Sequence, residues 1–297
     1  MTHWHGRSTP DELPRDLVER VLTGLGLTTT PAADLAGLST LYGAWCRHVP
    51  FDNIRKLIHL RSRSPGVLPG DSPQDFFDAW LRFRTGGTCW AGNGALCALL
   101  GALGFHVRRG VGTMLVRPNV PPNHGTVIAD FDGRLYVVDA SILHSEPLLL
   151  DETKVTRINH PAWGIECAPR DGRFHIRWRS IQLPTGVDCR IDQLSATREE
   201  FRERHERTRA WSPFNFELHA RLIRGESVVG IALGQRVEFT AGGEVSQRPL
   251  AGDERTRVLV EEIGISPEIV ARLPPDVPMP PPPAEYRAQP GGTGITE

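Results

Sequence analysis

The chain has 297 residues, enough for one large domain or two to three smaller ones. Hydrophobic residues make up 39% and charged residues 23%, values that exclude a disordered polyelectrolyte. Lys and Arg number 34 and Asp and Glu 35, so the formal net charge is -1. The composition therefore gives no electrostatic reason to expect nucleic acid or an anionic membrane surface as a partner.

Membrane and export signals are not predicted. No apolar run approaches the roughly 18 residues that a membrane helix needs. Residues 1–13 are polar and lack the apolar core of a signal peptide. We therefore expect a cytoplasmic protein.

The cysteines indicate neither a disulfide framework nor a structural zinc site. Their number is odd, they are far apart, and no two of them form a C-x-x-C pair. The terminal pair His3 and His5 is the one other metal candidate, and it lies on a short end of the chain. We predict no metal site. The five cysteines are Cys46, Cys89, Cys97, Cys167 and Cys189.

The first third of the sequence is predicted to be helical. Apolar residues at helical spacing predict a helix over 17–22, a second over 33–46 and a third around 76–81. Asp71 or Ser72 is a suitable cap for the third helix.

The segment around Cys89 carries the first chemical signal. A turn with Gly86 and Gly87 leads into an Ala- and Leu-rich helix over 90–103, which ends at Gly104. Cys89 lies in the first turn of that helix, where the macrodipole and free N–H groups favour a thiolate. The alternative is that Cys89 is a small buried apolar residue.

The middle third is predicted to be mostly strands. Alternating or apolar segments predict strands over 106–117, 126–131, 135–139 and 174–179. Asp132-Gly133 between the second and the third is a strong signal for a two-residue hairpin loop.

The hairpin brings two further polar residues together. With a two-residue loop, Phe131 pairs with Arg134, and the same register pairs Thr126 with Asp139. His124 then lies on the same face as Asp139, as its diagonal neighbour about 7–8 Å away at Cα. A histidine beside an aspartate is the base and its orienting group in a nucleophilic triad. A three-residue loop would break this arrangement.

The last third mixes helix and strand. Thr197 to Glu200 matches a capping box and starts a charged helix that extends to residue 209. The tail is rich in Pro and Gly and is expected to be extended or disordered. Further strands are predicted over 216–222, 228–233 and 237–239, and a short helix over 255–263.

Taken together, these segments resemble the arylamine N-acetyltransferase family, of which the chain looks like a divergent member. TGGTCWAGNG at 85–94 is similar to the family's Arg-Gly-Gly-x-Cys-x-Glu-x-Asn, and HVPFDNI at 48–54 to its Pro-Phe-Glu-Asn-Leu. NH at 123–124 and YVVD at 136–139 resemble its His strand and its Leu-Val-Asp-Val strand. SPFNF at 212–216 resembles its third domain, and the likeness extends from about residue 17 to 273.

The resemblance implies an α+β fold in three parts with a cysteine-protease-like Cys-His-Asp core. The parts would be an N-terminal helical bundle (1–84), a β-barrel domain to which the catalytic helix contributes Cys89 (85–194), and an α/β lid (195–273). Residues 274–297 would form the extended or disordered tail.

It also implies an acyltransferase of EC 2.3.1 type with catalytic Cys89, His124 and Asp139. Acetyl-CoA or another acyl-CoA would acylate Cys89 in a ping-pong reaction, and an amine, hydroxylamine or hydrazine would take up the acyl group. No cofactor would be permanently bound and no metal would be needed.

Three other functions remain open. One is an amide synthase that takes an acyl chain from a carrier-protein thioester, a reaction of bacterial biosynthetic pathways. The Gly- and Pro-rich, Arg-dominated composition is typical of a high-GC bacterium and agrees with it. The others are a thiol hydrolase and a non-catalytic binding protein.

Other residues receive supporting roles. Asn93 projects from the same helix face as Cys89 and is expected to support the catalytic residues. Phe51, Trp90, Ser141 and Ile142 are candidates for substrate binding. Phe51 would alternatively buttress the domain junction together with Asn53, and Trp90 would belong to the core.

The sequence departs from the family pattern at two places. Thr85 and Ala91 replace the usual Arg and Glu around the cysteine, so a cation and an anion are lost together. After Asp139 the family has Val-Gly-Phe-Gly, which lines the acceptor pocket, whereas this chain has ASIL at 140–143. The acceptor is then expected not to be a simple arylamine, or the acyl group not to be acetyl.

Overall fold

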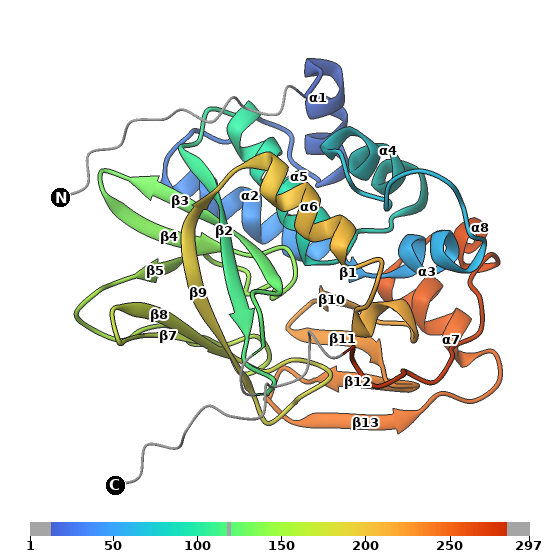
Figure 1. Cartoon of the computed structure of the whole chain (residues 1–297). Helices are drawn as coiled ribbons and strands as arrows, with labels where there is room; N and C mark the ends of the chain where they lie inside the picture. The colour runs from blue at the N-terminus through green and yellow to red at the C-terminus, as the bar shows by residue number, and fades with distance from the viewer. Residues whose placement is uncertain (1–12, 118–119, 284–297) are drawn as a thin grey trace, which may run out of the picture.

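The computed structural model describes residues 13–117 and 120–283 (Figure 1). Its first part is helical, and the three helices predicted there are confirmed. Asp34 and Ser72 cap two of them by accepting hydrogen bonds from Gly37 N at 2.7 Å and Asp75 N at 3.2 Å. The helices are α1 (Arg15–Gly24), α2 (Leu35–His48), α3 (Ile54–Arg61), α4 (Pro73–Phe83) and α5 (Cys89–Ala102), of which α3 was not predicted.

Helix α5 is the central element of the molecule. It contacts α4, α6 (Arg198–Arg207) and the strands β2 and β3 described below. Ten of its apolar or glycine positions are buried together with Asn93. A helix buried on all sides needs no polar face, which explains its Ala- and Leu-rich sequence.

The middle part is an eight-stranded antiparallel sheet that curls into a nearly closed barrel (Figure 1). Its spatial order is β5-β4-β3-β2-β9-β8-β7-β6. The two edge strands lie next to each other, and Thr156 Oγ1 donates to Leu149 O at 2.5 Å across the seam. The strands are β2 (Val107–Met114), β3 (His124–Phe131), β4 (Arg134–Val138), β5 (Leu148–Leu150), β6 (Thr156–Ile158), β7 (Ile165–Arg170), β8 (Arg173–Trp178) and β9 (Val187–Ala196).

The predicted hairpin and its register are confirmed. Asp132 and Gly133 form the two-residue loop with φ angles of 53° and 80°, in the left-handed region that this turn requires. Phe131 pairs with Arg134 at the loop. Asp139 directly follows β4, and His124 begins β3.

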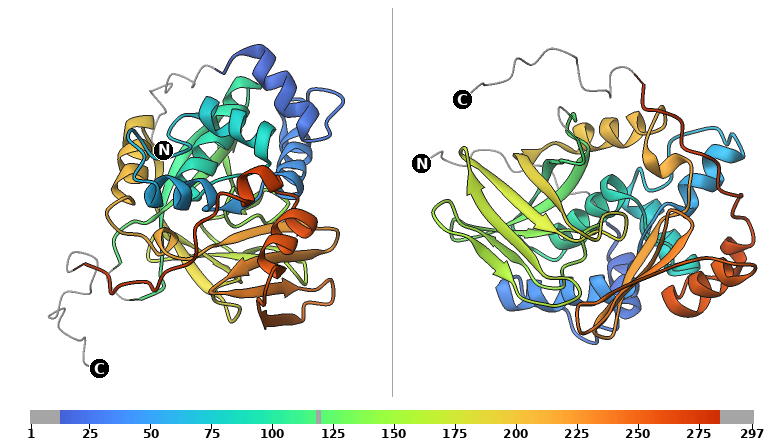
Figure 2. Two further views of the ribbon diagram at one scale, coloured as in Figure 1. Left: turned by 90° about the vertical axis from the view of Figure 1, so that its right-hand side faces the viewer. Right: turned by 90° about the horizontal axis from the view of Figure 1, so that it is seen from below.

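A second sheet of five strands has the order β1-β10-β11-β12-β13. Its apolar side packs against the C-terminal helical segments and against Ile54 and Leu57 of α3 (Figure 2). The elements are β1 (Phe51–Asp52), β10 (Ala220–Arg224), β11 (Ser227–Ala232), β12 (Gln235–Phe239), β13 (Val245–Pro249), α7 (Glu254–Arg257), the π-helical η2 (Val258–Ile263) and α8 (Pro267–Val270).

Two connecting pieces join the sheets. Helix α6 begins with the predicted capping box, in which Thr197 and Glu200 exchange hydrogen bonds at 3.1 and 2.7 Å. The 3₁₀ turn η1 (Pro213–Asn215) follows it. Because β1 comes from the N-terminal part and pairs with β10, the second sheet is not confined to 195–273. The division into three parts at those boundaries stays a prediction.

The ends of the chain are described only in part. Residues 274–283 contain neither helix nor strand. The rest of the predicted tail lies outside the described residues, as do His3 and His5 and the polar segment 1–12. Within the described ranges, no helix combines the length and the apolar character needed to cross a membrane.

Candidate active site

Cys89 is the first residue of α5, and the backbone before it is tightly held. The Asp52 carboxylate accepts a hydrogen bond from Gly86 N at 2.6 Å, and Asp52 N donates to Gly87 O at 3.3 Å. A Cβ atom at position 86 would lie 1.7 Å from Pro50 O, so only glycine fits there. Strand β1 thereby fixes the turn that places the thiol at the helix N-terminus.

Asp52 was not singled out in the sequence. Burial raises the pKa of this carboxyl to about 6, although the N–H groups of Gly86 and Ile54 stabilise the charged form. Within the described part of the chain, no basic side chain lies at ion-pair distance from it. Thr85 Oγ1 is buried and has no hydrogen-bond partner among the described residues. Arg84, next to it, is exposed and lies over the Trp80 ring at 5.2 Å.

His124 and Asp139 meet as the hairpin register predicts. His124 Nε2 and Asp139 Oδ2 are 2.7 Å apart, and both side chains are buried. The other carboxylate oxygen, Oδ1, accepts from Ser141 N at 2.8 Å, Ile142 N at 3.0 Å and Asn93 Nδ2 at 3.3 Å. Burial alone would raise the pKa of Asp139, but His124 and these donors hold it well below its usual range.

The Cys89 thiol completes the arrangement. Burial disfavours the imidazolium, but the Asp139 charge and its hydrogen bond, followed by those of Cys89, raise the pKa of His124 to about 10. Because Nε2 of His124 is hydrogen-bonded to Asp139, Nδ1 is the ring nitrogen that remains available to interact with the Cys89 sulfur. Cys89 Sγ also donates to Asn123 O at 3.8 Å. The structure thus brings together the three residues predicted as a triad, from α5, β3 and the end of β4.

Asn93 and Tyr42 support the site from behind. Asn93 Nδ2 donates to Gly125 O at 2.6 Å, and its Oδ1 accepts from Ala140 N at 2.9 Å, so it ties α5 to both sides of the hairpin. The Tyr42 hydroxyl donates to Asp139 O at 2.9 Å and accepts from Asp139 N and His144 N. Asn93 was predicted in this position, whereas Tyr42 was not.

The four candidates for substrate binding are all buried. Phe51 packs edge-on against Phe214, with ring centroids 5.2 Å apart. Trp90 packs in the same way against Phe201 at 5.1 Å. The backbone N–H groups of Ser141 and Ile142 donate hydrogen bonds to the Asp139 carboxylate. Their roles toward substrate stay predictions.

A buried lysine close to the site was not anticipated. Lys56, on α3, is 4% exposed, and its Nζ donates to Thr208 Oγ1 at 2.8 Å. Burial lowers its pKa to about 7, against the influence of Cys89 and Glu206. Lys56 therefore lies close enough to Cys89 for the cysteine to influence the pKa of the lysine. Among the described residues, no cluster of three or more His, Cys, Asp or Glu side chains is placed to hold a metal ion.

Comparison with known proteins agrees with this geometry. Residues 34–163 match the family model described as N-acetyltransferase. An arylamine N-acetyltransferase from Mycolicibacterium smegmatis is 30% identical over 151 residues, which are 47% of this chain and 52% of the relative. Over these segments the chain is similar in sequence to an arylamine N-acetyltransferase. The sequence alignment spans about half the length of that relative.

Solved arylamine N-acetyltransferases share the fold over most of the chain. The enzyme from M. tuberculosis has a TM-score of 0.71 at 21% identity, covering 85% of this chain and 93% of its own. The one from Salmonella typhimurium has a TM-score of 0.71 at 16% identity, covering 86% and 96%. The Mycobacterium marinum enzyme in complex with CoA also has a TM-score of 0.71, at 19% identity, covering 86% and 93%. The predicted α+β fold of this family is confirmed.

Proposed function

We propose that this protein is an acyltransferase that moves an acyl group from acyl-CoA to an amine, hydroxylamine or hydrazine through a thioester on Cys89. The observation that carries the proposal is the buried 2.7 Å contact between His124 and Asp139 beside a cysteine at a helix N-terminus. The relationship to arylamine N-acetyltransferases supports the same chemistry, and one such enzyme is known in complex with CoA.

The first half-reaction uses the thiolate–imidazolium pair. The Cys89 sulfur attacks the acyl carbonyl, and the new C–S bond forms as the bond to the CoA sulfur breaks. The imidazolium of His124 gives its proton to the departing CoA thiolate, so CoA leaves as the thiol. Asp139 stabilises the imidazolium before this transfer and keeps the ring oriented.

The second half-reaction restores the pair. The acceptor nitrogen attacks the thioester carbonyl, and the C–S bond to Cys89 breaks. Neutral His124 takes the proton that the nitrogen loses, which regenerates the thiolate beside an imidazolium. One acyl group has then moved from sulfur to nitrogen without any external oxidant or reductant.

The helix terminus supplies donors for the developing oxyanion. The first N–H groups of a helix have no intrahelical partner. In the described part of the chain the N-cap Thr88 makes no side-chain capping bond that would occupy them. These N–H groups and the dipole of α5 favour negative charge on the carbonyl oxygen.

The segment after Asp139 is relevant to which acceptor the protein uses. Ile142 joins an aliphatic cluster with Ile128 and Leu148. We propose that segment 140–143 selects an acceptor other than a simple arylamine, or an acyl group other than acetyl. Efficient acetyl transfer to plain anilines and hydrazides in a substrate panel would refute this part.

Intact-mass spectrometry tests the nucleophile and the donor together. After mixing with a series of acyl-CoAs, the parent protein is expected to gain one acyl group, and Cys89→Ser is expected to gain none. Cys97→Ser is the matched control, because Cys97 lies on the same helix and is also buried. A label that persists in Cys89→Ser would contradict the proposal. Labelling from an acyl carrier protein but from no acyl-CoA would replace it by the amide synthase.

A further inference from the structure

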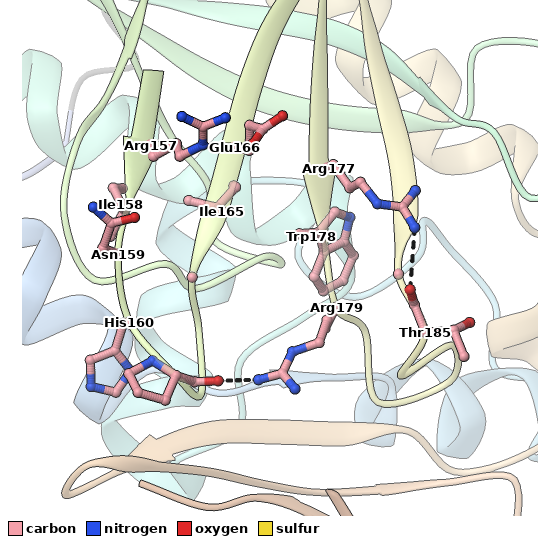
Figure 3. A pocket seen from close by; sticks show the side chains of 13 residues that line it. Arg157, Ile158, Asn159, His160, Ile165, Glu166, Arg177, Trp178, Arg179 and Thr185 are labelled. Atoms are coloured by element: carbon pink, nitrogen blue, oxygen red, sulfur yellow. Dashed lines mark hydrogen bonds and ion pairs between the residues drawn. The ribbon is translucent and has the colours of Figure 1, made fainter. Parts of the chain in front are cut away.

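A cavity lies away from Cys89, at the ends of the barrel strands. Its volume is about 610 Å³, within the range of small-molecule sites. It is bounded by β8, by the connection between β6 and β7, and by residues 185–186 before β9 (Figure 3). None of Cys89, His124 and Asp139 lines it.

The lining is rich in guanidinium groups. Arg157 pairs with Glu166 at 2.7 Å across the cavity wall, and Arg177 pairs with Asp188 at 3.1 Å. Figure 3 shows Trp178 between these two arginines, with Arg179 below them near His160. Glu166 is the one carboxylate in the described lining, while Asp188 and Glu226, outside it, pair with Arg177 and His160. Arg179 is then the lining arginine whose positive charge has no carboxylate partner among the described residues.

Arg179 is held in place by groups that leave its charge uncompensated. Its guanidinium donates to the backbone carbonyls of Gly243 and Pro161 and lies over the Phe239 ring at 4.9 Å. Among the described residues, no carboxylate lies within ion-pair distance of it. These contacts fix a cation at the rim of the cavity.

A buried arginine that does not itself line the cavity packs against Trp178, and the charge of Asp139 acts on it. Arg221 is 2% exposed, and its guanidinium lies over the Trp178 ring at 5.1 Å. It donates one hydrogen bond, to Ile142 O at 2.6 Å, while its Nε and Nη1 have no acceptor among the described residues. The Trp178 indole nitrogen is likewise buried without an acceptor in that part of the chain. Buried donors of this kind normally have a partner.

We propose that this cavity binds an organic anion with a flat aromatic body, such as an aryl carboxylate or a nucleotide phosphate. The indole of Trp178 offers a stacking surface, and the guanidinium groups suit the planar oxygens of a carboxylate or a phosphate. The uncompensated charge of Arg179 draws an anion into the cavity. The site is independent of the proposed acyl transfer and needs no reaction at Cys89.

Titration calorimetry on the full chain tests the site, with benzoate and adenosine 3′,5′-bisphosphate as probes. We expect at least one probe to bind, with an affinity that falls as the salt concentration rises. Arg179→Gln is expected to weaken that binding at least tenfold. Arg177→Gln, at the exposed rim, is expected to weaken binding about threefold to tenfold. This second variant tests the site even if Arg179→Gln disturbs the neighbouring turns.

Arg173→Gln is the matched control, because this exposed arginine is also on β8 but pairs with Asp192 outside the cavity. Arg173→Gln is expected to bind the probes like the parent. Cys89→Ser is also expected to bind them like the parent, and this result would separate the present proposal from the acylation chemistry. Binding of benzoate alone assigns a free aryl acid, and binding of the bisphosphate alone assigns a nucleotide. If neither probe binds at millimolar concentration, or if both cavity variants bind like the parent, the proposal is wrong.

Discussion

The carboxylate of Asp139 is surrounded by donors on both of its oxygens. One oxygen faces His124, and the other accepts three hydrogen bonds, two of them from backbone N–H groups. The group has no exposed surface. In such a setting a negative charge is stabilised by fixed dipoles as well as by the imidazolium, and it cannot turn away from the ring.

Replacing Asp139 by Asn tests that charge. The amide is nearly the same size, but it lacks the negative charge that raises the pKa of His124 to about 10. We expect the pKa of His124 to fall and the rate of Cys89 acylation to drop by about 10²–10⁴. The rate is measured by single-turnover mass spectrometry across a pH series.

A second aspartate serves as the control for Asp139→Asn. Asp151 also accepts two backbone hydrogen bonds, from Thr153 N and Lys154 N, but it lies outside the active site. Asp151→Asn is expected to be acylated at the parent rate. Equal rates for both variants would show that Asp139 does not act through His124.

The start of α5 depends on close contact between elements. Strand β1 and the turn at 85–87 approach so closely that Phe51 and Gly87 form a parallel bridge. Position 86 lies against Pro50 O, a backbone atom that cannot move aside as a side chain can. The position of Cys89 therefore depends on a glycine that itself takes no part in chemistry.

Two glycine substitutions in this region should have opposite effects. Gly86→Ala places a Cβ on Pro50 O and is expected to destabilise the fold by about 2 kcal/mol or more. Gly101→Ala, within α5, meets nothing within 4 Å and is expected to stabilise it by about 0.5–1 kcal/mol. Urea unfolding measures both. A stable Gly86→Ala protein would mean that the turn can shift away from β1.

The elements that the sequence predicts are those set by local signals. Helical periodicity predicts α1, α2 and α4, and the Asp-Gly loop predicts the β3–β4 hairpin and its register. Strand β1 is two residues long and exists because it pairs with β10, far along the chain. Helix α3 begins after Asn53, whose side chain does not cap it but donates to the carbonyls of Phe214 and Glu217. Neither element has a local signal of its own.

The residues of the candidate site also divide into those with a local sequence signal and those without one. Cys89, His124 and Asp139 are predicted from a helix start and one hairpin. The partners of Tyr42, Asp52 and Lys56 lie 97, 34 and 152 positions away along the chain, and no short motif links them. A buried tyrosine or lysine in a predicted helix therefore gives no sign of what it contacts.

Across the whole molecule, three buried histidines govern the response to acid. His144 follows the barrel hairpin, His205 lies on α6, and His219 precedes β10. Burial lowers the pKa of each to about 4. In the unfolded chain they titrate near 6.5, so between these values the unfolded state binds more protons.

The free energy of unfolding is therefore expected to fall as the pH drops from about 6.5 toward 4. Asp52 opposes this, because its raised pKa of about 6 lets the folded state bind a proton first. These three histidines against one carboxyl give a net uptake of about two protons on unfolding near pH 5, and the lowered pKa values of His48, His59 and His175 act in the same direction. His124 adds stability that is fully present below about pH 6.5 and is lost progressively as the pH rises from there through about 10.

Urea unfolding at several pH values between 4.5 and 8 would measure the slope. His219→Gln should flatten the slope by about one proton. A free energy of unfolding that stays constant from pH 7 to 5 would contradict this account.

The barrel also has a consequence for how the molecule folds. It consists of two chain-local meanders, β2 to β5 and β6 to β9, each made of consecutive hairpins. One non-local ladder, between β2 and β9, joins them, and such pairings form late because loop closure is slow. Val111 of β2 and Ala196 of β9 belong to the same buried cluster as Cys89. The sulfur that we propose as the nucleophile is therefore shielded only after the last ladder has closed, and a newly made chain exposes it to solvent until that moment.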